Sequence, residues 1–236
     1  RGINCIKNNY KEQKNEYNKF VTLHRKDDFN MKVILVNGSP HEFGSTNRAL
    51  EEVKSSLSKN GIETEVFWIG NDAIRGCLGC GSCIKSKRCF INDKVNEFLE
   101  KAKCADGFVF ASPVHYAGPT GFIKSFMDRC FYAKTDIFKY KPAAAVVSAR
   151  RGGCVSSFDD LNKYFLMSNM IVVGSNYWNQ VHGNNKEECE KDLEGLQTMR
   201  TLGNNMSWVL KLIENGKKNN IDMPLSEEKI KTNFIR

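Results

Sequence analysis

The sequence lacks several features that would assign it quickly to a functional class. No apolar run approaches the roughly 20 residues that a membrane-spanning helix needs, and the N-terminal segment has no apolar stretch typical of a secretory signal. There is no helix-turn-helix or zinc-finger spacing and no internal repeat. We therefore expect a cytoplasmic protein that binds neither a membrane nor nucleic acid.

Composition and charge favour one globular domain with polar ends. The chain has 236 residues, of which 41% are hydrophobic and 26% charged, and much of its net charge of +8 lies in the terminal segments. The remaining charge is scattered rather than concentrated in a basic stripe, so it gives no support to nucleic-acid binding. We expect a polar N-terminal extension over 1–30, one domain over 31–215 and a polar C-terminal tail over 216–236.

From residue 32 onward, short apolar runs alternate with amphipathic stretches, which is typical of an α/β protein with a parallel sheet. The apolar runs predict five strands, at 32–37, 63–68, 107–111, 143–148 and 171–174. The stretches between them predict helices at 46–59, 93–102, 121–132 and 156–167, and a last helix at 185–214. Such a sheet carries helices on both faces.

The segment 38–47, which follows the first strand, is rich in glycine and hydroxyl residues. It has neither the Gly-Lys-Ser/Thr of a Walker loop nor the G-x-G-x-x-G dinucleotide fingerprint. Its backbone N–H groups and the hydroxyls of Ser39, Ser45 and Thr46 precede a helix, where unpaired donors and the helix dipole attract an anion such as phosphate. The alternative is a Ser/Thr/Asn-rich helix cap with no ligand.

Two further loops, 112–121 and 148–153, follow the third and fourth strands, at the sheet edge where open α/β sheets bind ligands. The three loops read G-S-P-x-x-x-G-S-T-N, S-P-V-H-Y-A-G and S-A-R-R-G-G. In this order and spacing they resemble the NAD(P)H-dependent FMN reductase branch of the flavodoxin-like superfamily, from residue 31 to about 215. The resemblance implies a flavodoxin-like three-layer sandwich with a five-stranded parallel sheet in the order 2-1-3-4-5.

The resemblance also implies a set of FMN-binding residues. Those that would hold the phosphate are Ser39, Gly44, Ser45, Thr46 and Asn47. Those that would flank the isoalloxazine are Pro113, Val114, His115 and Tyr116, and those that would close its pyrimidine side are Ser148, Gly152 and Gly153. Because the flavin carries the chemistry, no catalytic side chain is required; His115 is a candidate proton donor, with a structural role as its alternative.

Four of the nine cysteines, Cys77, Cys80, Cys83 and Cys89, lie within thirteen residues in the pattern C-x2-C-x2-C-x5-C. In a reducing compartment such thiols bind metals or carry redox chemistry rather than form disulfides. The spacing suits a [4Fe–4S] cluster; the alternatives are a zinc site and a set of thiols without metal. The pattern is similar to that of the iron–sulfur flavoproteins, which favours a cluster beside the flavin.

The function implied is an FMN-dependent oxidoreductase. It would take electrons from NAD(P)H, bound transiently, or from reduced ferredoxin, and pass them to a small acceptor such as a quinone, a nitro or azo compound, or an oxygen species. One alternative is an FMN-only reductase with structural or redox-active cysteines. Another is a non-catalytic electron carrier or regulatory binding module.

Two expectations concern the later part of the chain. The helix at 185–214 carries an apolar stripe that includes Leu193, Met199 and Met206, which suits either a homodimer or homotetramer interface or packing on the chain's own sheet. Cys154, just after Gly153 and near a helix start, is a candidate for a lowered pKa, with an ordinary structural thiol as the favoured interpretation.

Overall fold

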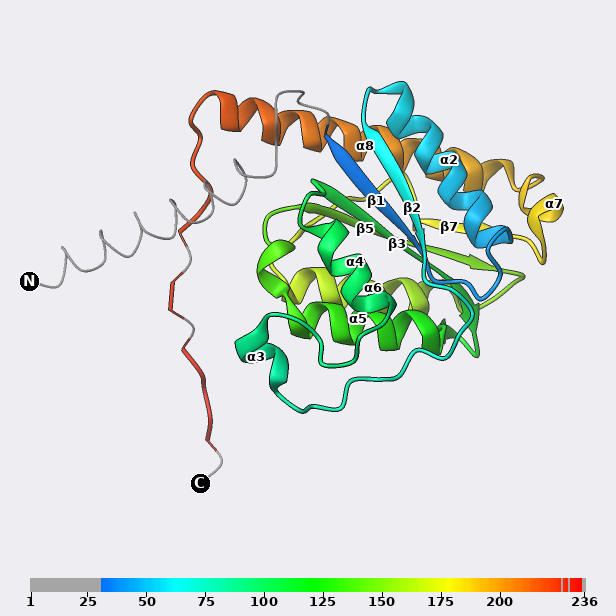
Figure 1. The fold of residues 1–236 in the computed structure, drawn as a ribbon. Helices are drawn as coiled ribbons and strands as arrows, with labels where there is room; N and C mark the ends of the chain where they lie inside the picture. Colours follow the sequence, from blue (N-terminus) through cyan, green and yellow to red (C-terminus); the bar gives the residue numbers. More distant parts are fainter. Residues whose placement is uncertain (1–30, 226, 229, 235–236) are drawn as a thin grey trace, which may run out of the picture. The chain divides into compact units, whose positions relative to one another are not determined.

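Short runs of apolar residues form a central, mainly parallel sheet, seen edge-on among the helices in Figure 1. The computed structural model describes residues 31–225, 227–228 and 230–234, so the expected extension at 1–30 lies outside the described residues. One compact unit spans 30–213. The architecture below is that of the 30–213 unit.

The strands are β1 (Lys32–Asn37), β2 (Glu63–Trp68), β3 (Gly107–His115), β4 (Gly118–Pro119), β5 (Pro142–Ala149), β6 (Ile171–Val172) and β7 (Gln180–His182). The helices are α2 (Ser45–Lys59), α3 (Ser82–Ser86), α4 (Lys94–Ala102), α5 (Gly121–Ala133), α6 (Cys154–Met167), α7 (Lys186–Cys189) and α8 (Leu193–Lys218), with a 3-10 turn at Thr135–Ile137. The sheet order is β2-β1-β3-β5-β6, with β4 antiparallel to β3 and β7 parallel to β5.

Alternate residues of each central strand enter two separate cores, which gives the three-layer sandwich. Ile34 and Val36 of β1 pack with α4, α5 and α6 in a core rich in phenylalanine, whereas Val33 and Leu35 pack with α2 and α8 on the other face. Figure 1 shows the same division of helices between the two faces. The predicted α/β fold class, with helices on both faces, is confirmed.

The strand count is seven rather than the predicted five, because β4 pairs with the end of β3 and the fifth position of the sheet is filled by two short strands. β6 pairs with the beginning of β5 and β7 with its end. Between them the side chain of Asn179, only 1% exposed, donates from Nδ2 to the carbonyl of Ala145 at 3.0 Å. This bond satisfies a backbone acceptor that the missing strand would have paired, so the interruption leaves no orphan there.

The predicted helix at 185–214 is also divided, because Asp192 starts a new helix. Its Oδ1 accepts the N–H of Gly195 at 2.9 Å, as an N-cap does, and its Oδ2 accepts the N–H of His182 at 2.6 Å. α7 therefore ends at Cys189, and α8 runs from Leu193 to Lys218.

The apolar stripe on α8 lies against the chain's own sheet. Its buried members are Leu196, Met199, Leu202, Met206 and Leu210, while Leu193 is 73% exposed. The stripe is thus used within the domain, and the expected homodimer or homotetramer stays a prediction without support from this helix. No helix in the described part of the chain is long and apolar enough to cross a membrane.

Gly203 allows α8 to pack closely on α2. A Cβ at this position would lie 2.6 Å from the Cβ of Ser56 and 2.9 Å from the carbonyl oxygen of Val53. We predict that Gly203→Ala lowers the free energy of unfolding by about 1–2 kcal/mol, because overpacking outweighs the better helix propensity of alanine.

The control is Gly121→Ala at the start of α5, where a Cβ meets nothing within 4 Å. Urea unfolding of both variants measures the difference. A Gly203→Ala protein as stable as Gly121→Ala would contradict the close packing of α2 and α8.

Candidate functional site

The first loop leaves β1 at a position that only glycine fits. A Cβ on Gly38 would lie 2.6 Å from the carbonyl oxygen of Ala111 on the neighbouring strand. The loop is then held by Asn37, whose Oδ1 accepts the N–H of Ser39 at 3.0 Å and whose Nδ2 donates to the carbonyl of Glu42 at 3.0 Å. The indole N–H of Trp68 donates to the carbonyl of Ser39 at 2.8 Å. These bonds fix the loop before any ligand arrives.

The N-terminus of α2 presents donors that fit an anion. Gly44 is the N-cap and provides no side-chain cap, and the first turn contains no acidic residue. The N–H groups that begin the helix are therefore left for an acceptor that the helix itself does not provide. Ser45, Thr46 and Asn47 lie in this turn, but their side chains bind Gly183, Ser148 and Glu51, so the backbone N–H groups are the donors left for an anion. The phosphate role of these residues stays a prediction.

The loops at the carboxyl ends of the strands contact one another. The hydroxyls of Thr46 and Ser148 are 2.8 Å apart in a buried hydrogen bond that joins the start of α2 to β5. Ser45 donates from Oγ to the carbonyl of Gly183 at 3.2 Å, and Thr120 donates from Oγ1 to the carbonyl of Gly38 at 2.9 Å. The structure thus brings the predicted phosphate-binding residues together with Ser148.

The second and third loops also meet. Gly153 has φ +88°, and a Cβ there would lie 2.7 Å from the Cα of Ala117 and 2.8 Å from Cγ1 of Val114. Pro113 and Val114 are half-buried, whereas His115 and Tyr116 are exposed, and Gly152 has open space around it. An exposed aromatic beside a close-packed loop offers a flat surface to a ring system. The roles assigned to these residues, His115 included, stay predictions.

All four cysteines of the C-x2-C-x2-C-x5-C motif line one cavity of about 200 Å³. Its other walls are mostly apolar and include Ile84, Phe90 and Tyr132. The loop turns sharply at Gly79 and Gly81, both with positive φ, before the short helix α3. Cys77 and Cys80 are exposed, and Cys83 and Cys89 are half-buried.

In the part of the chain that the structure describes, no three Cys, His, Asp or Glu side chains converge on a position for a single metal ion. A mononuclear zinc site requires such convergence. In a cubane each thiolate binds a different iron at a different corner, so the sulfurs stand further apart around a shared cavity. The cavity brings the four thiols to one place, and the metal group that they would hold stays a prediction.

The cysteine cavity lies toward the end of α5, whereas the loops predicted to bind the flavin lie before its start. The position of a cluster relative to the flavin stays a prediction. The loops at 113–120 precede α5, while the cavity is lined by Arg129, Tyr132 and Ala133 near its end. At 1.5 Å per residue, these positions are roughly 15 Å apart along the helix axis. Figure 1 shows α3 far from the carboxyl ends of the strands.

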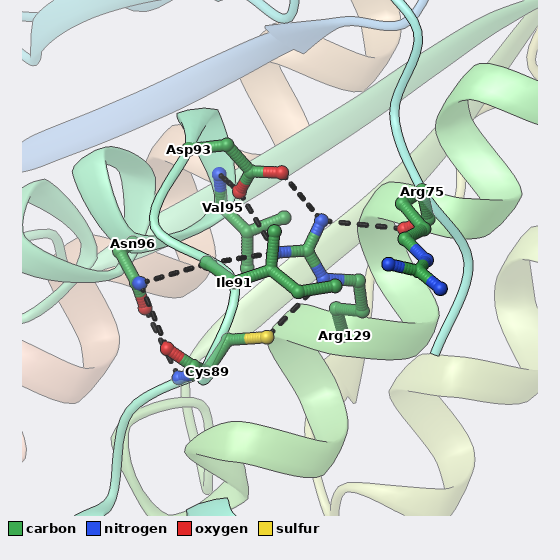
Figure 2. A network of polar contacts seen from close by, with 7 residues as sticks. All are labelled: Arg75, Cys89, Ile91, Asp93, Val95, Asn96 and Arg129. Atoms are coloured by element: carbon green, nitrogen blue, oxygen red, sulfur yellow. Dashed lines mark hydrogen bonds and ion pairs between the residues drawn. The ribbon is translucent and has the colours of Figure 1, made fainter. Parts of the chain in front are cut away.

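A buried arginine on α5 links the cysteine loop to the domain (Figure 2). The guanidinium of Arg129, 1% exposed, donates from Nη1 and Nη2 to the two carboxylate oxygens of Asp93 at 2.6 and 2.8 Å. Its Nε donates to Sγ of Cys89 at 3.2 Å. Burial alone would lower the pKa of Arg129, but the hydrogen bonds with Asp93 and Cys89 outweigh it, so the pKa is raised and the residue stays charged.

Of this network, the sequence motifs identify Cys89 but not Arg129 or Asp93, which lie outside the glycine- and cysteine-rich loops. A signal does exist in the sequence. Arg129 lies among the buried residues of α5, which include Phe126, Met127, Cys130 and Phe131. A charged residue on the buried side of a helix requires partners nearby.

Two cysteine thiols differ in their ionisation. The pKa of Cys80 is lowered by hydrogen bonds with the backbone and hydroxyl of Ser82, which favours the thiolate that a metal binds. For Cys154 the pKa is raised rather than lowered, by burial and, secondarily, by the negative charge of Asp192. Although Cys154 begins α6, the burial of its thiol is the main cause of the raised pKa.

Comparison with known proteins assigns the chain to a family. Residues 31–185 match the model of the NADPH-dependent FMN reductase family. The chain is 35% identical over 192 residues to an iron–sulfur flavoprotein of Methanocaldococcus jannaschii, covering 78% of this chain and 100% of that protein. It is 27% identical to an iron–sulfur flavoprotein of Methanosarcina thermophila, covering 79% and 99%.

The chain belongs to the NADPH-dependent FMN reductase family, in its iron–sulfur flavoprotein branch. As a member of this family it is an FMN-dependent oxidoreductase, and FMN is its cofactor. Its binding by the loops at the N-terminus of α2 and after β3 and β5 stays a prediction.

Solved structures show the same fold. RosB, crystallised with 8-demethyl-8-formylriboflavin-5'-phosphate, has a TM-score of 0.62 at 15% identity and covers 87% of this chain and 94% of that one. An archaeal flavodoxin has a TM-score of 0.55 at 16% identity, with 77% and 99% covered. At this level of identity the likeness shows the fold alone, which is flavodoxin-like.

If the FMN phosphate binds at the start of α2, as the sequence predicts, a charge at Gly44 will affect its binding. Asp and Asn are equally good N-caps, so Gly44→Asp and Gly44→Asn should both preserve the helix. We predict that the Asp variant binds FMN at least tenfold more weakly than the Asn variant at low salt, because its carboxylate repels the phosphate.

Titration of the apoprotein with FMN, followed by quenching of flavin fluorescence, gives both affinities. The difference should shrink as salt is added. Equal affinities of the Asp and Asn variants would place the phosphate elsewhere.

Proposed function

We propose that this protein is an FMN oxidoreductase that holds a [4Fe–4S] cluster on Cys77, Cys80, Cys83 and Cys89. The observation that carries the proposal is that these four thiols line a single cavity, with a buried arginine donating to one of them. The names of the related iron–sulfur flavoproteins support it. Iron–sulfur cubanes are held by four cysteine thiolates, which this cavity supplies.

Within this proposal the chain's residues bind and shield the cofactors. FMN, when bound, supplies the hydride and electron transfer chemistry. The start of α2 binds its phosphate, and the close contact of Gly153 with Val114 and Ala117 shapes the floor against which the ring system lies. Tyr116 is fully exposed beside this floor and can cover one side of the ring.

We infer that the electron donor is NAD(P)H or reduced ferredoxin and that the acceptor is a small molecule such as a quinone, a nitro or azo compound, or an oxygen species. The chain has no separate dinucleotide fingerprint, so a nicotinamide would dock transiently over the flavin. An FMN-only reductase with free thiols is the competing function. The cytoplasmic location and the lack of membrane and nucleic-acid partners stay predictions.

The test is anaerobic purification with analysis of iron and acid-labile sulfide. We predict about four iron and four sulfide per chain, together with FMN absorption. Cys80→Ser should lose the iron and keep the FMN. Cys104→Ser is the matched control, because Cys104 is also exposed but does not line the cavity.

Flavin absorption without iron in the wild-type protein would contradict the cluster and favour an FMN-only reductase. The donor is decided by a second assay of the same preparation. Steady oxidation of NADH or NADPH with a quinone acceptor supports nicotinamide as donor, whereas reduction only by reduced ferredoxin excludes it.

A further inference from the structure

Cys89 is held differently from the other three cysteines of the cavity. Cys77 accepts a long hydrogen bond from the N–H of Gly79 at 3.5 Å, and Cys83 lies 3.7 Å from the carbonyl oxygen of Tyr132. Cys80 contacts the hydroxyl of Ser82 at 3.6 Å. Among the four, only Cys89 receives a donor from a charged group, the Nε of Arg129 at 3.2 Å.

The geometry of Arg129 leaves no freedom in where that donor points. A guanidinium has five N–H donors in a rigid plane, and all five have acceptors here. Four of them go to the two oxygens of Asp93 and to the carbonyls of Arg75 and Ile91, at distances of 2.6 to 3.3 Å. The fifth, on Nε, is directed at Sγ of Cys89, as Figure 2 shows.

The backbone of Cys89 is fixed as well. Asn96, which is buried, accepts the N–H of Cys89 with Oδ1 at 3.1 Å and donates to its carbonyl with Nδ2 at 3.0 Å. Asn96 and Asp93 both belong to the beginning of α4, and Asp93 is its N-cap. The sulfur and its donor are therefore held from two helices, α4 and α5.

Asp93 balances the positive charge of Arg129 within this network. The bidentate pair with Asp93 places a carboxylate against the guanidinium, so the group next to Cys89 is an oriented N–H rather than a free cation. A hydrogen bond to a ligand sulfur stabilises negative charge on that sulfur. Such bonds are one of the main factors that set the reduction potential of an iron–sulfur cluster.

We propose that Arg129 is a positioning residue that raises the reduction potential of the cluster through its hydrogen bond to Cys89. This inference rests on the proposed function, because it requires a cluster at the four cysteines. It assigns to one ligand a role that the cysteine motif does not distinguish.

The experiment compares the cluster potentials of Arg129→Lys and Asp93→Asn by anaerobic spectroelectrochemistry. Lysine keeps the positive charge near Asp93 but loses the directed Nε–H, so the potential should fall. We expect a shift of at least tenfold in the one-electron equilibrium, which corresponds to about 59 mV. Asp93→Asn keeps the arginine and the N-cap and removes a negative charge, so its potential should stay the same or rise.

A fall in the potential of Arg129→Lys without a fall in Asp93→Asn separates tuning from simple structural support, since both variants should lower the thermal stability of the protein. An unchanged potential in Arg129→Lys, or an equal fall in both variants, would overturn the proposal. The double variant Arg129→Met/Asp93→Asn leaves no buried charge unpaired, and its potential should also lie below that of the wild type.

Loss of the cluster from Arg129→Lys and from the double variant alike would also overturn the proposal, in favour of a role in retaining iron. Wild-type protein without iron would instead refute the proposed function itself, so the two failures are distinguishable by iron analysis of the wild type.

Discussion

Parallel strands β1, β3 and β5 are buried on both faces, and this burial forces their connecting loops to the edges of the sheet. The loops that follow the three strands must meet at one edge. The hydrogen bond between Thr46 and Ser148 and the close approach of Gly153 to Ala117 are consequences of that meeting. The positions of the loops predicted to bind the flavin therefore depend on the apolar residues that bury β1, β3 and β5.

The cysteine loop depends on a different interaction. It forms part of the long connection between β2 and α4 and lies mainly on the surface, so the sheet alone does not hold it. Arg129 and Asp93 tie the end of this connection to α5, and Asn96 fixes the backbone of Cys89. A surface loop with apolar walls and four thiols is thus anchored at one end, while Cys77 and Cys80 are left exposed.

Much of this arrangement can be predicted from the sequence because it depends on short stretches of neighbouring residues. Runs such as Val33–Val36 define strands by composition, and the G-S-P-x-x-x-G-S-T-N loop combines a strand end, a tight turn and a helix start in ten residues. What was missed depends on contacts between distant residues. Asn179 donates a hydrogen bond to Ala145 in place of a strand, and Asp192 starts a new helix and accepts the N–H of His182. Arg129 on α5 pairs with Asp93 at the start of α4. Nothing in local sequence specifies these pairs.

The separation of the flavin loops and the cysteine cavity along α5 was also beyond sequence reasoning, because it depends on the path of the β2–α4 connection. The most direct test of the account is an anomalous difference map, measured at the iron edge, from crystals grown anaerobically with FMN. The account predicts iron density bounded by Cys77, Cys80, Cys83 and Cys89, with the FMN phosphate at the start of α2. A map with FMN bound at α2 but no iron at these cysteines would contradict it.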